Sequence, residues 1–182
     1  MTQALLIIDI QNDYFPGGAM ELVGSPEAGA KAAELLKAFR TASRPIIHIQ
    51  HVAVDPDATF FLPNTHGVEI HKSVTPLEGE TLFQKNHPNS FLETPLLAYL
   101  RDHQITQLVI VGMMTHMCID TSTRAASDLG FECVLAYDAC ATKSLTFGDV
   151  KVPAEHVQAS YLAAIDGSFA TVLSVDDVLS TL

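Results

Sequence analysis

The sequence has few positive charges and no cluster of them. Its 182 residues carry 10 Lys and Arg against 21 Asp and Glu, which gives a formal net charge of −11 with histidine neutral. Proteins that bind nucleic acid or anionic membranes need clustered Lys and Arg, so we expect neither as a partner. A small-molecule substrate is compatible with this charge, because a few cations can lie inside an acidic protein.

Long apolar runs and secretion signals are also lacking. No apolar stretch reaches the roughly 18 residues that cross a bilayer, and the N-terminal residues show no basic start and no small-residue cleavage site. We therefore expect a cytoplasmic protein. Its three cysteines, Cys118, Cys133 and Cys140, are an odd number in a chain that is large enough to fold without disulfides, so reduced thiols are expected.

Hydrophobic residues make up 48% of the chain and charged ones 17%, a composition that excludes intrinsic disorder. The length predicts a single domain over residues 1–182. Short aliphatic runs alternate with amphipathic stretches, the pattern of a parallel sheet covered by helices in a three-layer α/β/α fold. The expected strands are 4–10, 45–51, 81–85, 107–112, 132–137 and 171–173.

Helix start and stop signals lie between these strands. Ser25 before Pro26 is expected to be the N-cap of the first helix, and Gly130 is expected to end a helix that begins at Cys118. The other expected helices are 94–100, 153–166 and a short one after residue 174. Residues 52–79 fit neither period, and an irregular segment of that length is more often functional than idle.

Three polar residues follow apolar runs that we expect to be strands. Asp9 and Lys85 end two of the runs, and Cys118 lies six residues beyond a third. Ligands of open α/β sheets bind at the carboxyl ends of strands, so these side chains are candidates for one site. Alone, each has a plainer interpretation: Asp9 as the cap of a turn, Lys85 as a solvated lysine and Cys118 as a small buried hydrophobe.

Together the three residues suggest acyl transfer from an amide. A helix N-terminus and a nearby ammonium favour the thiolate of a cysteine. A carboxylate beside them can take the thiol proton and return it to a leaving amine, and backbone N–H groups can receive the oxyanion. Cys133 and Cys140 are expected to be core thiols, because free cysteine is usually buried.

The blocks that contain these residues resemble the isochorismatase-like cysteine hydrolase superfamily. They are residues 5–15 (LLIIDIQNDYF), 81–91 (TLFQKNHPNSF), 108–126 (LVIVGMMTHMCIDTSTRAA) and 136–142 (AYDACAT). The resemblance implies a six-stranded, Rossmann-like parallel sheet and assembly into a homo-oligomer, a dimer or a tetramer. By position, Asp9 matches the family's general base, Lys85 its catalytic lysine and Cys118 its nucleophile.

The resemblance also implies a cis peptide bond between Met113 and Met114, which would direct the backbone N–H groups of Met114 and Cys118 at the oxyanion. Isochorismatases proper lack the cysteine, so Cys118 favours an amidase-like hydrolase. Nicotinamidases carry an Asp-x-His metal motif, whereas residues 48–55 here read HIQHVAVD. His66 and His71 also lack the spacing and partners of a metal site. We therefore expect no metal and no cofactor.

The predicted function is a metal-independent cysteine hydrolase that cleaves a C–N bond of a small molecule through a thioester. The alternatives are a catalytically silent binding protein or oligomeric scaffold of the same fold, and a nicotinamidase-like amidase. A dinucleotide-binding protein is disfavoured, because residues 11–13 (QND) replace the glycine-rich turn after the first strand.

Aromatic residues near the predicted site suit a small planar or apolar substrate. The candidates for substrate contact are Phe15, Phe61, Phe91 and His116, and Phe60 adjoins the second of them. Each aromatic ring is equally compatible with a place in the core. His116, in the nucleophile loop, is equally compatible with a solvent-facing position or a subunit contact.

Overall fold

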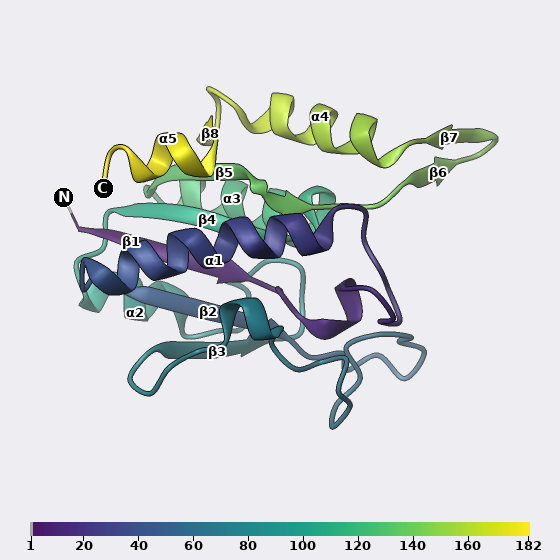
Figure 1. Cartoon of the computed structure of the whole chain (residues 1–182), viewed down its shortest axis with the longest axis horizontal. Coiled ribbons are helices and arrows are strands. Elements are labelled where there is room, and N and C mark those ends of the chain that lie inside the picture. The colour runs from purple at the N-terminus through teal and green to yellow at the C-terminus, as the bar shows by residue number, and fades with distance from the viewer. Residues whose placement is uncertain (1) are drawn as a thin grey trace.

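The computed structural model describes residues 2–182. Its centre is a six-stranded, all-parallel sheet in the order β3-β2-β1-β4-β5-β8, with helices on both faces (Figure 1). The strands are β1 (Gln3–Ile8), β2 (Ile46–His51), β3 (Thr81–Lys85), β4 (Gln107–Met113), β5 (Glu132–Ala141) and β8 (Thr171–Leu173). The predicted three-layer α/β/α fold is confirmed.

Two cores lie on opposite faces of the sheet. The helices are α1 (Ser25–Thr41), α2 (Leu96–Asp102), α3 (Asp120–Asp128), α4 (Ala154–Ile165) and α5 (Val175–Leu179). Alternate side chains of β1 point to opposite sides, so that Leu5 and Ile7 pack with α1 and α5, while Leu6 and Ile8 pack with α2 and α3. Because β1 is buried on both faces, it is apolar throughout, as expected of a central parallel strand.

Several helix and strand boundaries differ from the predicted ones because of the local backbone conformation. β1 ends at Ile8 and not at residue 10, because Asp9 adopts a positive φ of 53° and turns the chain out of the sheet. The N-cap of α1 is Gly24, with a φ of 74°, and Ser25 is the first helical residue. The expected helix from Cys118 begins earlier, in a π-helical turn over Thr115–Ile119 that leads into α3.

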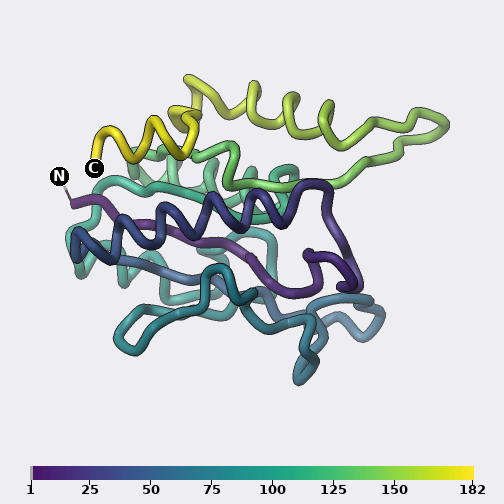
Figure 2. The backbone as a smooth tube through the Cα atoms, in the orientation of Figure 1, coloured from purple at the N-terminus to yellow at the C-terminus, as the bar shows by residue number. Residues whose placement is uncertain are grey.

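The strand β5 and the segment after it also differ from expectation. β5 runs four residues past its predicted end, because a register shift after Ile110 lets Gly112 and Met113 pair with Cys140 and Ala141. An unpredicted antiparallel hairpin, β6 (Leu145–Phe147) and β7 (Val150–Val152), then extends from one end of the molecule (Figures 1 and 2).

Residues 52–79 are irregular, as predicted, apart from the single 3-10 turn Lys72–Val74. They begin at the carboxyl edge of the sheet, after β2, and return to its amino edge, where β3 starts (Figure 2). Within residues 2–182, none of the helices has the length and apolar character that crossing a membrane requires.

Candidate active site

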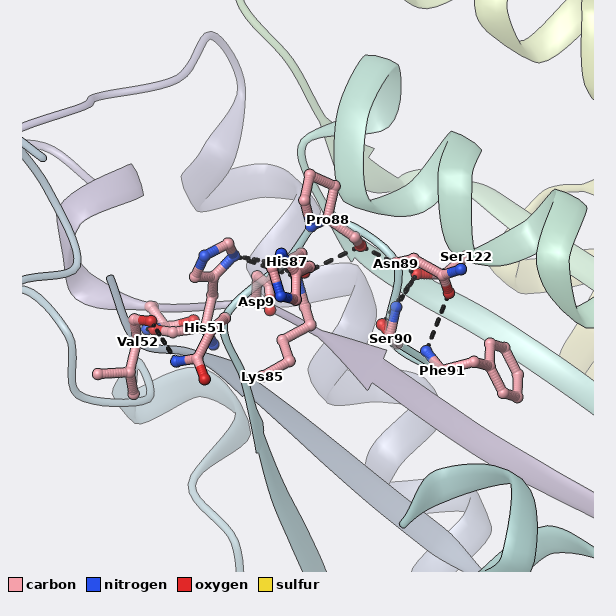
Figure 3. Close-up of polar contacts among 12 residues, drawn as sticks. Asp9, His51, Val52, Lys85, His87, Pro88, Asn89, Ser90, Phe91 and Ser122 are labelled. Atoms are coloured by element: carbon pink, nitrogen blue, oxygen red, sulfur yellow. Dashed lines mark hydrogen bonds and ion pairs between the residues drawn. The ribbon is translucent and has the colours of Figure 1, made fainter. Parts of the chain in front are cut away.

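Asp9, Lys85 and Cys118 meet at the carboxyl edge of the sheet. Asp9 follows β1, Lys85 ends β3, and Cys118 lies in the π-helical turn after β4. The strand β2 separates β1 from β3, and its last residue, His51, pairs in register with Lys85. His51 therefore lies beside both Asp9 and Lys85 (Figure 3).

The Lys85 ammonium is fully engaged by protein groups. Its Nζ lies 2.7 Å from Asp9 Oδ2, and both side chains have no exposed surface. Nζ also donates to His51 Nδ1 at 3.2 Å and to the carbonyls of His87 at 3.0 Å and Pro88 at 3.4 Å (Figure 3). Since an ammonium has three protons, Lys85 can donate to a substrate only by releasing one of these partners.

Electrostatics keep Lys85 charged despite its burial. Burial alone would lower the pKa of Lys85, but Asp9 and Cys118 outweigh it and raise that pKa above its usual value. Lys85 is therefore a fixed positive charge beside the carboxylate and the sulfur.

Cys118 lies next to the carboxylate. Its Sγ, an Asp9 carboxylate oxygen and a His51 ring nitrogen lie within 4.8 Å of one another. Burial and the Asp9 charge raise the pKa of Cys118, and Lys85 only partly opposes them. The thiol is therefore protonated at neutral pH, and the prediction of a favoured thiolate is wrong. Asp9 Oδ1 is buried without a hydrogen-bond partner among residues 2–182, so it is free to accept a proton.

The nucleophile loop is packed tightly against β1. Gly112 has a φ of 136°, and a Cβ there would lie 1.9 Å from the Ile8 carbonyl oxygen, so only glycine fits. The Met113–Met114 peptide bond is cis. The Met114 carbonyl accepts from the N–H groups of Met117 at 3.0 Å and Ile119 at 3.2 Å. The oxyanion role of the Met114 and Cys118 N–H groups stays a prediction.

His51 is a site residue that the sequence analysis missed. Burial and the neighbouring Lys85 lower its pKa, and the weaker influence of Asp9 opposes them. Neutral His51 accepts the Lys85 proton at Nδ1, which places its own hydrogen on Nε2. Gln11 fixes the His51 backbone by accepting from its N–H at 2.8 Å and donating to its carbonyl at 2.9 Å. The strand-end rule that selected Lys85 also applies to His51.

The donor atoms of Asp9, His51 and Cys118 are close enough to suggest a metal site. The Lys85 ammonium, however, already contacts Asp9 and His51, and a cation held by the three donors would have to displace it. The other histidines considered for metal binding are engaged elsewhere. His66 contacts Glu69, and the His71 ring stacks on Phe15 with 3.5 Å between centroids.

The predicted substrate-contacting residues are distributed among several places. Phe61 lines a hollow of about 560 Å³ together with His51, Phe60, Asn86 and His87. Phe15 lines a different hollow of about 770 Å³. Phe91 stacks on Phe131 at 6.2 Å, and His116 Nδ1 lies 2.6 Å from Thr142 Oγ1. Of the four candidates, only Phe61 shares a hollow with His51.

A buried carboxylate holds Phe61 in place. Asp13 accepts from the Phe61 N–H at 2.6 Å and from the Ala19 N–H at 3.1 Å. A Cβ at Gly67 would lie 2.1 Å from the same carboxylate, so the chain comes close to Asp13 at that position. Phe61 itself has a φ of 57°, which this packing enforces.

The loop after Lys85 is tied to the helix after Cys118. Ser122 Oγ accepts from the Ser90 N–H at 3.0 Å and donates to Ser90 Oγ at 2.8 Å, and both side chains are buried (Figure 3). Cys133 and Cys140 are buried away from this network, and burial raises the pKa of each thiol to about 12. Their prediction as core thiols is confirmed.

Known proteins resemble this chain over nearly its whole length. A model of the isochorismatase domain matches residues 3–177. The uncharacterized isochorismatase family protein YddQ of Bacillus subtilis is 49% identical over 179 residues, which are 98% of this chain and 99% of that protein. The crystal structure of an isochorismatase hydrolase from Oleispira antarctica has a TM-score of 0.95 at 47% identity, covering 98% of this chain and 96% of that one.

A relative with a named activity is more distant. A streptothricin hydrolase of Streptomyces noursei is 35% identical over 143 residues, which are 77% of this chain and 50% of that protein. The present chain thus matches about half the length of that hydrolase.

Proposed function

The chain belongs to the isochorismatase family of hydrolases, and from that premise we propose a cysteine hydrolase that cleaves a C–N bond of a small amide through a thioester at Cys118. One arrangement supports this proposal above all. A buried carboxylate, Asp9, is held at Oδ2 by Lys85, its Oδ1 has no hydrogen-bond partner within residues 2–182, and the Cys118 Sγ lies within 4.8 Å of one carboxylate oxygen.

The acylation step uses Asp9 as a base. The Asp9 carboxylate takes the Cys118 thiol proton as Sγ bonds to the amide carbonyl carbon, and the carbonyl π electrons move to the carbonyl oxygen. When that oxyanion collapses, the C–N bond breaks and the proton on Asp9 passes to the leaving nitrogen. The products of this step are an amine, or ammonia from a primary amide, and a thioester on Cys118.

Hydrolysis of the thioester uses the same carboxylate. Asp9 takes a proton from water as the water oxygen bonds to the carbonyl carbon, and collapse of the second oxyanion breaks the C–S bond. The sulfur leaves with its electron pair and takes the proton back from Asp9, which restores the thiol and releases a carboxylic acid. Lys85 supplies a positive charge that stabilises the transient thiolate without giving up a proton.

The hollow beside His51 is the proposed place for the acyl group. Its volume of about 560 Å³ lies within the usual range for small-molecule sites. The rings of Phe60 and Phe61 form part of its wall, Asp55 lines it as well, and no lysine or arginine does. This lining favours a neutral, flat or apolar acyl group over one that carries a carboxylate.

A binding protein without catalysis is the second candidate, and the burial of Cys118, which is 4% exposed, favours it. A panel of small amides, carbamoyl compounds and lactams, scored for release of ammonia or amine, distinguishes the two. We expect turnover by the wild type and by Cys133→Ala, whose thiol is remote from the site, and none by Cys118→Ala. Turnover that survives in Cys118→Ala would overturn the mechanism.

A further inference from the structure

The hairpin formed by β6 and β7 has one apolar face, which is half-buried at its base and exposed at its tip. Leu145 pairs with Val152, and Phe147 pairs with Val150. Directly paired residues lie on the same face of a hairpin, and residues two apart lie on that face too, so these four apolar side chains form a single surface. Thr146 and Lys151 occupy the other face.

The tip of this surface carries the most exposed large apolar side chain among residues 2–182. Phe147 is 88% exposed and Val150 63% exposed. The two strands form a sheet of their own and extend beyond the N-terminal end of α4, away from the main sheet (Figures 1 and 2). A two-stranded hairpin on its own is marginally stable in water. Contact between its apolar face and another surface would stabilise it.

A hollow of about 280 Å³ lies at the root of the hairpin. It is lined by residues before the hairpin, such as Tyr137 and Thr142, by Ala154 just after it, and by Val23, which precedes α1. Val23 and Tyr137 are 65% and 43% exposed, so the mouth of the hollow is apolar. Its volume falls just below the usual range of ligand pockets and suits a single aromatic side chain.

Charge distinguishes the two surfaces. The hollow is lined by Glu27, Asp138 and Glu155 and by no lysine or arginine. The segment 143–152 carries Lys143 and Lys151 against the single acid Asp149, so it is locally cationic in a chain of net charge −11. The hairpin and the hollow are therefore complementary in charge.

We propose that this hairpin is a dimerisation arm, and that Phe147 of each copy inserts into the hollow at the root of the arm of a second copy. Each chain carries both parts of the contact, with Phe147 at the tip of the hairpin and the hollow at its root. When two such arms lie side by side in opposite directions, each tip reaches the other's root, and a two-fold axis closes the assembly. The hairpin cannot fill its own hollow, because its tip points away from its root (Figure 1).

Sedimentation velocity over a wide range of protein concentration tests the proposal. We expect a wild-type dimer whose dissociation constant rises about 30-fold or more in Phe147→Asp, as on removal of an aromatic hot spot. Val150→Asp should weaken the dimer in the same direction. Leu77→Asp is the matched control, because Leu77 is 56% exposed on a different segment, and it should leave the dimer unchanged.

Crosslinking tests the specific pairing. Val23→Cys and Phe147→Cys, purified separately and mixed under mild oxidation, should form a disulfide between chains, whereas Leu77→Cys mixed with Val23→Cys should not. A wild type that is monomeric at every concentration, or a dimer unaffected by Phe147→Asp, overturns the proposal. So does the absence of the 23–147 crosslink at a concentration where sedimentation shows the mixed Val23→Cys and Phe147→Cys proteins to be dimeric. None of these readouts depends on finding a substrate, so the proposal can fail while the proposed hydrolase function stands.

Discussion

Lys85 Nζ lies 2.7 Å from Asp9 Oδ2, and both side chains are completely buried. The pair sits at the ends of β3 and β1, with His51 of β2 against it. A buried charge is tolerated when a partner of opposite sign compensates for it, and removal of one partner leaves the other charge without compensation. This single contact therefore links the stability of the fold to the chemistry of the site.

Loss of Lys85 should destabilise the protein strongly. In Lys85→Met the Asp9 carboxylate stays buried without its partner, and we expect a loss of about 3–5 kcal/mol in the free energy of unfolding. Urea denaturation measures it. Lys31→Met is the control, because Lys31 pairs with Glu34 and Asp176 at the surface and should change stability little. Equal effects of the two substitutions would contradict the importance of the buried pair.

Two substitutions of His51 should show whether its hydrogen-bond acceptor or only its bulk matters for catalysis. His51→Leu removes one of the four acceptors around Lys85 Nζ, so the ammonium is free to shift toward the His87 and Pro88 carbonyls and kcat should fall by about 10-fold or more. His51→Gln offers a carbonyl oxygen in place of Nδ1 and should restore much of the rate. Steady-state kinetics on an active amide measure both variants, and equal rates for the two would show that the Nδ1 contact is unimportant.

The contact between Lys85 Nζ and His51 Nδ1 predicts that hydrolase activity falls at acidic pH. Protonated His51 presents Nδ1–H to the Lys85 ammonium, and the facing groups Asp9, Cys118 and His87 cannot remove that conflict. Burial and Lys85 lower the pKa of His51, so wild-type activity should fall only below the ordinary pKa of histidine. His51→Gln should lack this fall, and an unchanged fall in His51→Gln would assign it to another group.

Glu80 should contribute stability that depends on pH. Its carboxylate accepts from Arg40 Nε at 2.6 Å, His48 Nε2 lies 2.9 Å away, and the Leu77 N–H donates at 3.0 Å. Although burial raises the pKa of Glu80, these partners together lower it to about 2. A lowered folded-state pKa stabilises the fold above the unfolded-state value and loses that contribution as the pH falls toward about 2.

Urea denaturation of wild type and Glu80→Gln across this range checks the prediction. The wild type should be more stable by about 1–3 kcal/mol near neutral pH, and the difference should shrink between the ordinary glutamate pKa and about 2. A difference that grows on acidification would have the wrong sign for a carboxylate held in its charged form.

The sequence predicted the sheet and most of the site because both follow from local patterns. Continuous apolar runs marked the central strands, and polar residues at their ends marked Asp9, Lys85 and Cys118 as neighbours. His51 was missed because residues 48–55 were compared only with a metal-binding motif, although the strand-end rule that selected Lys85 applies to His51 equally. The hairpin was missed because its strands have three residues each, too few to show a period.

The state of the cysteine was predicted wrongly for a physical reason. A helix terminus and a lysine can be recognised in a sequence, and both favour a thiolate. The depth of burial and the distance to Asp9 depend on tertiary packing, and in the structure they dominate and raise the pKa of Cys118. Phe15 and Phe91 likewise follow site residues in sequence while packing on His71 and Phe131.

Alkylation of Cys118 by iodoacetamide as a function of pH, in wild type and in Asp9→Asn, tests the role of Asp9 as proton acceptor most directly. Mass mapping assigns the label, and circular dichroism confirms that each protein is folded, since unfolding would expose Cys133 and Cys140 as well. Asp9 raises the pKa of the thiol, so its removal beside an intact Lys85 should lower that pKa.

We therefore expect slow alkylation of the wild type near neutral pH and faster alkylation of Asp9→Asn, while amide turnover by the variant falls by about 10²–10⁴. Alkylation of Asp9→Asn that is no faster than wild type, together with wild-type turnover, would contradict the assignment of Asp9 as the base that activates Cys118.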